Sequence, residues 1–155
     1  MKTKVLIFGL PGSGKTTFAK KLQLAMHDCC HINADAVRQA ANDWDFSMPG
    51  RIQQAHRMHS LAEQSNSASI VCDFVCPFAS IRDALFHDYI KVFMNTIESS
   101  RYSDTNNVFE HPMCTDYEIT NFNQIDDLIE ILVAKQIEPC YNTNVKQQTP
   151  GSFNG

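Results

Sequence analysis

The residues with the clearest chemistry form one segment near the start of the chain, Gly9-Leu10-Pro11-Gly12-Ser13-Gly14-Lys15-Thr16. This spacing is typical of a phosphate-binding loop, because the glycines let successive backbone N–H groups point at an anion. The lysine adds a positive charge near the β- and γ-phosphates, and the threonine hydroxyl can bind Mg²⁺. The segment therefore predicts a site for ATP and Mg²⁺. The expected nucleotide contacts are Gly9, Pro11, Gly12, Ser13, Gly14, Lys15, Thr16 and Thr17.

Such a loop needs a strand before it and a helix after it, and both are predicted here. Residues 4–8 form a continuous apolar run, as expected for a central parallel strand covered on both faces. From Lys15 onward, Phe18, Ala19, Leu22 and Met26 recur at helical spacing. The loop by itself indicates binding and not chemistry, so a module that binds nucleotide without turnover stays an alternative.

Strands alternate with helices along the rest of the chain. Further strands are expected at 30–33, 70–75, 89–94 and 117–120, and helices at 34–41, 49–64, 79–87 and 125–137. Right-handed crossovers between parallel strands then predict a three-layer α/β/α fold with a parallel, roughly five-stranded sheet. Ligands bind such a sheet at the carboxyl ends of its strands.

The length of 155 residues favours one domain, assigned to 1–140. Residues 99–112 are polar and lack a hydrophobic period, so we expect a mobile lid over about 99–116. Residues 141–155 are rich in Asn, Gln, Thr and Gly, which predicts a disordered tail.

The composition of the chain limits the classes of partner that we expect. The net charge of −4 and a pI near 5.8 argue against a protein that wraps nucleic acid. Six cysteines show no paired metal spacing and are interpreted as reduced thiols. No apolar run is long enough to span a bilayer and no targeting segment is visible, so we expect a cytoplasmic protein without a membrane partner. A homodimer stays open.

Three further segments resemble a known family. Residues 32–38 (Ile-Asn-Ala-Asp-Ala-Val-Arg) and 46–57 are similar to the acceptor-site segments of adenylylsulfate kinases. Residues 74–78 (Phe-Val-Cys-Pro-Phe), followed by Arg82-Asp83, resemble that family's Phe-Ile-Ser-Pro-Tyr/Phe segment and its own Arg-Asp. The resemblance covers about 2–95 in the same order. Beyond it, residues 104–112 look like the shortened lid of some relatives, without the longer Phe-Thr-Gly-Ile-Asp lid.

The resemblance implies roles for particular residues. Asp35 would lie near the acceptor hydroxyl and Mg²⁺ and orient or deprotonate the nucleophile, while Arg38 and Arg51 would bind an anionic acceptor. The alternatives are a helix-capping role for Asp35 and a solvated surface position for the arginines. The residues expected to contact the acceptor are Asp35, Arg38, Phe46, Arg51, Gln54, Phe74, Cys76 and Pro77.

Four departures from the family lie in the acceptor segments. Gly50 stands where the family usually has Asp, Gln54 where it has Asn, His56 where it has Arg, and Cys76 where it has Ser. The phosphate side matches better than the acceptor side. Transfer to a hydroxyl is therefore better supported than adenylylsulfate as the particular acceptor.

Two weaker candidates complete the predicted site. Asp73 ends an apolar strand, as a metal-binding carboxylate would, or it makes only local hydrogen bonds. The predicted metal-binding residues are thus Thr16, Asp35 and Asp73. Arg101 begins the proposed lid, where a cation could stabilise the transferring phosphoryl group, although surface arginines are common. With Lys15 and Asp35 it completes the predicted catalytic set.

The sequence as a whole predicts an ATP- and Mg²⁺-dependent kinase of the adenylylsulfate kinase type, acting on a hydroxyl of a small anionic, nucleotide-like acceptor. One alternative is a nucleotide-binding accessory module whose altered acceptor side has lost catalysis. Another is a kinase acting on a polynucleotide or nucleoside hydroxyl, which the overall acidity disfavours.

Overall fold

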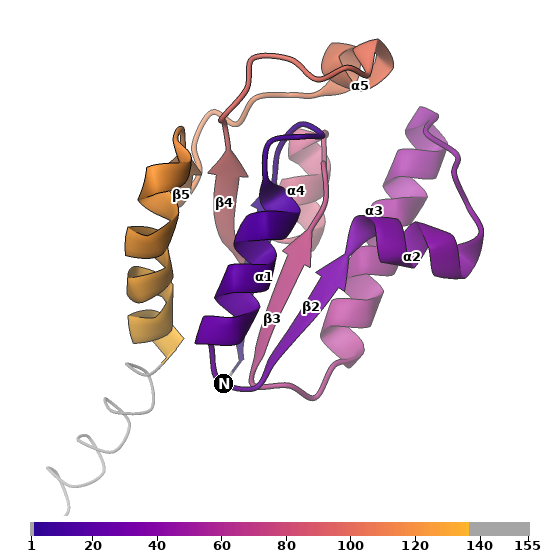
Figure 1. Ribbon diagram of the computed structural model, residues 1–155. Helices are drawn as coiled ribbons and strands as arrows, with labels where there is room; N and C mark the ends of the chain where they lie inside the picture. The colour runs from indigo at the N-terminus through magenta and orange to yellow at the C-terminus, as the bar shows by residue number, and fades with distance from the viewer. Residues whose placement is uncertain (1, 137–155) are drawn as a thin grey trace, which may run out of the picture.

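The structure, a computed structural model, describes residues 2–136. Its centre is a five-stranded sheet in the order β2-β3-β1-β4-β5, and every neighbouring pair is parallel (Figure 1). The strands are β1 (Thr3–Phe8), β2 (Cys29–Asn33), β3 (Ser69–Asp73), β4 (Ile90–Met94) and β5 (Tyr117–Ile119). The continuous apolar run of β1 is explained by its place in the middle of the sheet, where both faces are covered.

Helices cover both faces of the sheet (Figure 1). They are α1 (Lys15–Ala25), α2 (Ala34–Ala41), α3 (Met48–Gln64), α4 (Ala79–Leu85), α5 (Ser103–Val108), the short 3-10 helix η1 (Phe122–Gln124) and a helix over residues 125–136. On one face Met58 of α3 packs with Leu6 and Cys72, and on the other Phe18 of α1 packs with Val71 and Leu128. The predicted three-layer α/β/α fold is confirmed.

Several predicted boundaries differ from the structure by one or two residues, and one helix was not predicted at all. The helix expected at 79–87, for example, ends at Leu85. The third strand ends at Asp73 and not at 75, because the chain turns away at Cys76, whose φ is 44°. The predicted lid contains helix α5, which the sequence hides because its only buried residue is the polar Thr105. Phe109, just after α5, is buried and stacks on Phe93 of β4 with ring centroids 5.8 Å apart. The predicted tail at 141–155 lies outside the described residues.

The topology brings the candidate site together. The carboxyl ends of β1, β2 and β3 lie at one edge of the sheet, where β1 runs into the glycine loop and β2 runs into α2 (Figure 1). Within residues 2–136, no helix is both long enough and apolar enough to cross a bilayer.

Candidate active site

The glycine loop has the backbone geometry of an anion nest. Gly9, Gly12 and Gly14 all have positive φ, and Gly14, at 97°, is the N-cap of α1. Lys15 is 8% exposed, and its Nζ donates to the Leu10 carbonyl oxygen at 2.9 Å. Burial lowers the pKa of Lys15 to about 8, and the charges of Asp73 and Asp35 oppose this shift. The loop therefore holds one partly desolvated cation at the start of a helix, where phosphates bind.

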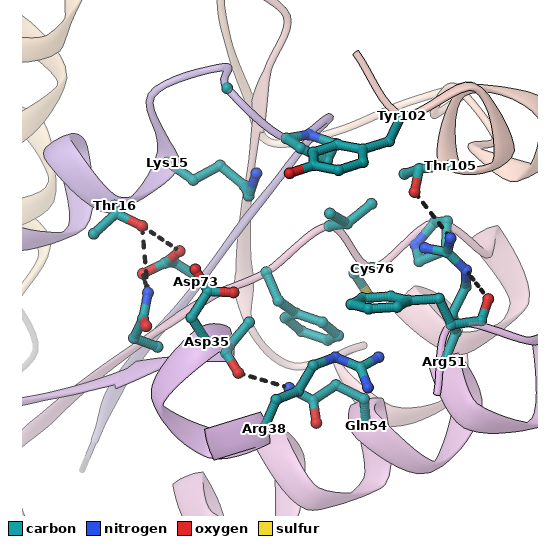
Figure 2. Close-up of a pocket in the computed structure, with 18 of the residues that line it drawn as sticks. Lys15, Thr16, Asp35, Arg38, Arg51, Gln54, Asp73, Cys76, Tyr102 and Thr105 are labelled. Atoms are coloured by element: carbon teal, nitrogen blue, oxygen red, sulfur yellow. Dashed lines mark hydrogen bonds between the residues drawn. The ribbon is translucent and has the colours of Figure 1, made fainter. Parts of the chain in front are cut away.

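Thr16 and Asp73 meet at the carboxyl end of β3. The Thr16 hydroxyl donates to Asp73 Oδ1 at 3.2 Å, and Asn33 Nδ2 donates to Asp73 Oδ2 at 3.2 Å (Figure 2). His31 Nε2 lies 2.5 Å from the same Oδ2. Asp73 is 2% exposed, so its carboxylate depends on these neighbours for hydrogen bonds.

The residues present fit a magnesium ion bound together with a nucleotide. A hydroxyl and a carboxylate next to a phosphate loop are the oxygen donors that Mg²⁺ accepts, while it keeps waters and phosphate oxygens as its other ligands. Within residues 2–136, no group of three or more His, Cys, Asp or Glu side chains could hold a metal ion by itself. Thr16 and Asp73 form the fitting pair, whereas no hydrogen bond joins Asp35 to either of them in this part of the chain.

A cleft of about 870 Å³ opens beside the loop. Figure 2 shows Lys15 and Thr16 at one end of it and Arg51 and Thr105 at the other. The lining includes these predicted residues: Pro11, Gly12, Gly14, Lys15, Thr16, Thr17, Asp35, Arg38, Phe46, Arg51, Gln54, Asp73, Phe74, Cys76 and Pro77. One cavity therefore connects the residues predicted to bind the nucleotide with those predicted to bind the acceptor.

Asp35 lies in the first turn of α2, at the middle of this cleft. It is exposed, and its charge acts on Lys15, so the carboxylate faces the loop end of the cleft. The capping role weighed from the sequence belongs to Asn33, whose Oδ1 accepts from Ala36 N at 3.1 Å. Asp35 is thus free to face a ligand.

Arg38 and Arg51 are both buried and both hold the loop that precedes α3. Arg38 Nη1 donates to the carbonyl oxygens of Asp43 and Asp45 at 3.0 and 3.2 Å. Arg51 Nε donates to the Phe46 carbonyl at 2.8 Å, and both guanidinium groups lie over the Phe46 ring. Burial lowers the pKa of each guanidinium, yet both stay charged at neutral pH. The solvated surface position considered from the sequence is therefore wrong.

The floor of the acceptor end contains a buried, unpartnered polar atom. Gln54 is 3% exposed, and its Nε2 donates to the Ala34 carbonyl at 3.0 Å, but its Oε1 has no hydrogen-bond donor among the described residues. Nearby, burial raises the pKa of the Cys76 thiol to about 12, so this cysteine is a neutral wall residue and not a nucleophile. A ligand with an N–H or O–H group would satisfy Gln54.

The structure gives a steric reason for glycine at position 50, where the resembled family usually has Asp. A Cβ on Gly50 would lie 2.3 Å from the Asp45 carbonyl oxygen and 2.5 Å from Asp45 Cγ. The loop before α3 therefore occupies the space that a side chain at position 50 would need. His56, by contrast, is exposed and does not line the cleft, so its assignment to the acceptor side is wrong.

Three predicted residues stand apart from the cleft lining. Gly9 and the fully buried Ser13 belong to the glycine loop but do not line the cleft. Arg101 donates through Nη2 to its neighbour, the Tyr102 hydroxyl, at 2.8 Å, and lies in a shallow surface pocket over Pro11 and Gly12. The structure does not bring Arg101 to Lys15 or Asp35, and its catalytic role stays a prediction.

The structure adds residues that sequence reasoning missed. Trp44, Tyr102 and Thr105 line the cleft, and His31 contacts Asp73 from the neighbouring strand. Trp44 lies between two aspartates and two residues before Phe46, and an aromatic residue in such a polar segment was a usable sequence signal; the structure shows that it is half-exposed, as aromatic side chains at binding surfaces often are. His31 could have been noticed from its i, i+2 spacing to Asn33, which places both on one face of β2.

Comparisons with known proteins agree with this geometry. The sequence matches the family described as adenylylsulphate kinase over residues 1–144. It is also similar to the bifunctional enzyme NodQ of Azospirillum brasilense, 31% identical over 100 residues, with 57% of this chain and 16% of that protein covered. NodQ of Rhizobium tropici is 29% identical over the same coverage. The chain thus spans 16% of the length of these curated relatives.

Solved structures share the fold at low sequence identity. The Mycobacterium tuberculosis APS kinase CysC, in complex with AMPPNP and APS, has a TM-score of 0.70 at 20% identity, covering 88% of this chain and 98% of that chain. The hexameric APS kinase from Thiobacillus denitrificans gives 0.68 at 20%, covering 91% and 30%. Shikimate kinase from Aquifex aeolicus gives 0.59 at 10%, covering 90% and 99%.

Proposed function

Because the chain belongs to the adenylylsulphate kinase family, we propose that it transfers the γ-phosphate of ATP to a hydroxyl of a small, anionic, nucleotide-like acceptor. The observation that carries the proposal is the single cleft that has Lys15 at one end and the buried guanidinium groups of Arg38 and Arg51 at the other. A kinase needs two anionic molecules placed head to head, and this cleft offers a cationic group at each end.

The nucleotide end binds and neutralises the phosphates. The N–H groups of the loop and the N-terminus of α1 bind the phosphate oxygens, and Lys15 leaves the Leu10 carbonyl to contact the β- and γ-phosphates. Thr16 and Asp73 would hold a magnesium ion, which when bound neutralises charge on the phosphates.

Asp35 is placed to act on the acceptor hydroxyl. In the transfer, the acceptor oxygen forms a bond to the γ-phosphorus, while the bond from that phosphorus to the β–γ bridging oxygen breaks and ADP leaves. The hydroxyl proton passes to the Asp35 carboxylate, which faces the loop end of the cleft. Asp35 also orients the hydroxyl before the reaction.

The acceptor end selects by charge and by hydrogen bonding. Arg38 and Arg51 attract an anionic group, and Phe46, 45% exposed, offers an apolar face to a planar ring. The unpartnered Gln54 Oε1 favours a ligand that presents an N–H donor. A phosphate or sulfate ester of a purine nucleoside combines these three features. Adenylylsulfate belongs to this class.

The test is a coupled assay of ADP release, with ATP, Mg²⁺ and a panel of acceptors containing adenylylsulfate, nucleoside monophosphates, shikimate and sugars. We expect turnover with an anionic nucleotide, and loss of that turnover in Lys15→Ala and Asp35→Asn. Background rates that are equal in wild type and Lys15→Ala for every acceptor would refute the proposal.

A nucleotide-binding module without catalysis is the second candidate. It is favoured by one observation: Arg38 and Arg51 already hydrogen-bond backbone carbonyls of the loop before α3, so their donors partly serve the fold. Tight ATP binding without phosphoryl transfer to any acceptor would support this reading, and measurable turnover would end it.

A further inference from the structure

Asp104 of helix α5 carries a negative charge into the acceptor end of the cleft. Its Oδ2 lies 3.4 Å from Arg51 Nη2, and both residues line the cleft. The Asp104 side chain is 69% exposed, whereas that of Arg51 is 6% exposed. Among residues 2–136, Asp104 has no other hydrogen-bond or ion-pair partner. Its carboxylate therefore occupies one side of a cation that we expect to bind the acceptor.

The backbone beside Asp104 is held in place by buried contacts. Thr105 is 5% exposed, and its Oγ1 accepts a hydrogen bond from Arg51 Nη2 at 2.9 Å (Figure 2). Just after α5, the buried Phe109 stacks on Phe93 of β4. The backbone position of Asp104 is thus fixed from both sides, and its carboxylate stays within reach of Arg51.

The charged groups that line the cleft balance one another. In the part of the chain that the structure describes, they are three cations and three carboxylates: Lys15, Arg38, Arg51, Asp35, Asp73 and Asp104. At the nucleotide end Asp73 offsets Lys15. The two arginines meet two carboxylates, Asp35 at the middle of the cleft and Asp104 at its acceptor end, so their formal charges cancel. Without Asp104, this end would have an excess positive charge.

The balance limits how much negative charge an acceptor can bring. An anion bound by Arg51 lies close to the Asp104 carboxylate, and like charges repel with an energy proportional to the charge on each. Arg51 Nη1 makes no hydrogen bond to any described residue, so it can still donate to an anionic oxygen. One negative charge can therefore bind here, and a second one meets repulsion.

We propose that Asp104 is a specificity-determining residue that selects against acceptors carrying two negative charges. The inference rests on the proposed acceptor site and narrows its substrate class to nucleotides with a singly charged group, such as a phosphodiester. Adenylylsulfate has one negative charge on its phosphate and another on its sulfate. It should therefore bind more weakly than a singly charged nucleotide of similar size.

A purely structural role for Asp104 predicts a change of the opposite sign. Asp104 lies in the first turn of α5, where a carboxylate stabilises a helix, and its pair with Arg51 joins α5 to α3. If the pair only held α5 over the cleft, removal of the carboxylate would loosen α5 and weaken the binding of every acceptor. If Asp104 selects by charge, its removal strengthens binding, and does so most for a doubly charged acceptor.

The experiment measures the binding of adenosine 5′-phosphate and of its methyl ester by titration calorimetry at pH 7.5, with saturating ADP and Mg²⁺. At this pH the phosphate monoester is mainly a dianion and its methyl ester is a monoanion. The proteins are wild type, Asp104→Asn, Asp104→Glu and the control Asp126→Asn. Asp126 is 82% exposed and pairs with Lys21, so the control removes one surface charge elsewhere.

We expect Asp104→Asn to bind the dianion about 5-fold more tightly than wild type does, as for the loss of one exposed charge contact. The gain for the monoanion should be about 2-fold, because the repulsion is proportional to the charge of the ligand. Asp104→Glu and Asp126→Asn should match wild type. The gain should shrink in 0.5 M salt, since dissolved ions screen an exposed charge.

Each other outcome overturns the inference. Weaker binding of both probes by Asp104→Asn would make Asp104 a support for α5, and an unchanged ratio of the two affinities would remove it from specificity. If Asp104→Asn does not fold, Asp104→Ser removes the same charge and has the same expected result. If wild type binds neither probe, the proposed acceptor site is refuted and the inference with it. Turnover by wild type with an unchanged ratio in Asp104→Asn would refute the inference alone.

Discussion

His31 Nε2 lies 2.5 Å from Asp73 Oδ2, and the two side chains come from neighbouring parallel strands. In the register of β2 with β3, Asp73 pairs with Asn33, and His31 lies two residues earlier on the same face of β2. One strand thus supplies two neighbours to a single buried carboxylate oxygen, while Thr16 contacts the other oxygen. The orientation of Asp73 toward Thr16 is therefore set from β2.

The first prediction concerns His31 as a positioning residue. His31→Ala should raise the Mg²⁺ concentration needed for half-maximal turnover by about 10-fold, because removing a residue that orients a metal-binding carboxylate typically lowers metal affinity by at least this factor. The KM for the acceptor should stay unchanged, and His31→Gln should restore part of the loss. His56→Gln is the matched control, since His56 is exposed and away from the cleft. An equal change in Mg²⁺ dependence and acceptor KM would contradict a positioning role.

The second prediction is a pH dependence of nucleotide binding. The pKa of Lys15 in the free protein is lowered by burial to about 8, and bound phosphates raise it again. Binding therefore takes up a proton above pH 8, and ADP affinity should fall as pH rises past 8, by up to about 10-fold per unit. Below pH 8 the lysine is already charged, and this contribution to affinity is fully present.

Calorimetry at pH 7, 8 and 9, in two buffers with different ionisation enthalpies, measures both the affinity and the proton uptake. Lys15→Arg is the control, because an arginine stays charged over this range and should remove the dependence above pH 8. Identical pH profiles for wild type and Lys15→Arg would assign the effect to another group.

The third prediction links the proposed acceptor end to helix α5, which lies in the predicted lid. Arg51 Nη2 donates to Thr105 Oγ1 at 2.9 Å, which joins α3 to α5 through a buried contact. Thr105→Val keeps the shape and removes the acceptor oxygen, so the acceptor KM should rise by about 5-fold, the equivalent of one hydrogen bond of about 1 kcal/mol. ATP affinity should not change. Ser103→Ala, on the exposed surface of α5, is the control.

Sequence reasoning was strongest where one residue type is required by local backbone geometry or by burial. The order of the strands and helices followed from apolar runs and helical spacing, and the phosphate loop from its glycines, because these signals are local. It failed where contacts depend on residues far apart in the chain. Helix α5 has no apolar stripe, and the contact between Phe109 and Phe93 that fixes the chain after it is visible only in three dimensions.

The acceptor side shows the same limit. Arg38 and Arg51 both line the cleft, but nothing in the sequence indicates that they hydrogen-bond the carbonyls of residues 43, 45 and 46. The exposed position of His56 was also hidden, because its helix phase is set by which face of α3 packs on the sheet. Relative placement of side chains on one helix depends on tertiary packing and not on the motif.

The last prediction uses Gly50, where two physical effects have opposite signs. Gly50 lies in the first turn of α3, and alanine is normally about 1 kcal/mol more favourable than glycine in a helix. Its Cβ, however, would lie 2.3 Å from the Asp45 carbonyl oxygen, which accepts a hydrogen bond from Arg38. Gly50→Ala should therefore displace the loop before α3, lower the melting temperature, and weaken acceptor binding while leaving ATP affinity unchanged.

Thermal unfolding and acceptor KM measured on Gly50→Ala decide between these effects. Gln53→Ala, at an exposed position of the same helix, is the control for a change in helix propensity. A higher melting temperature with an unchanged acceptor KM would mean that the loop before α3 can move aside without a loss of stability. The close contact between Gly50 and Asp45 would then have no part in shaping the acceptor end. A lower melting temperature with a raised KM would instead assign this departure from the family to the placement of Phe46 and Arg38.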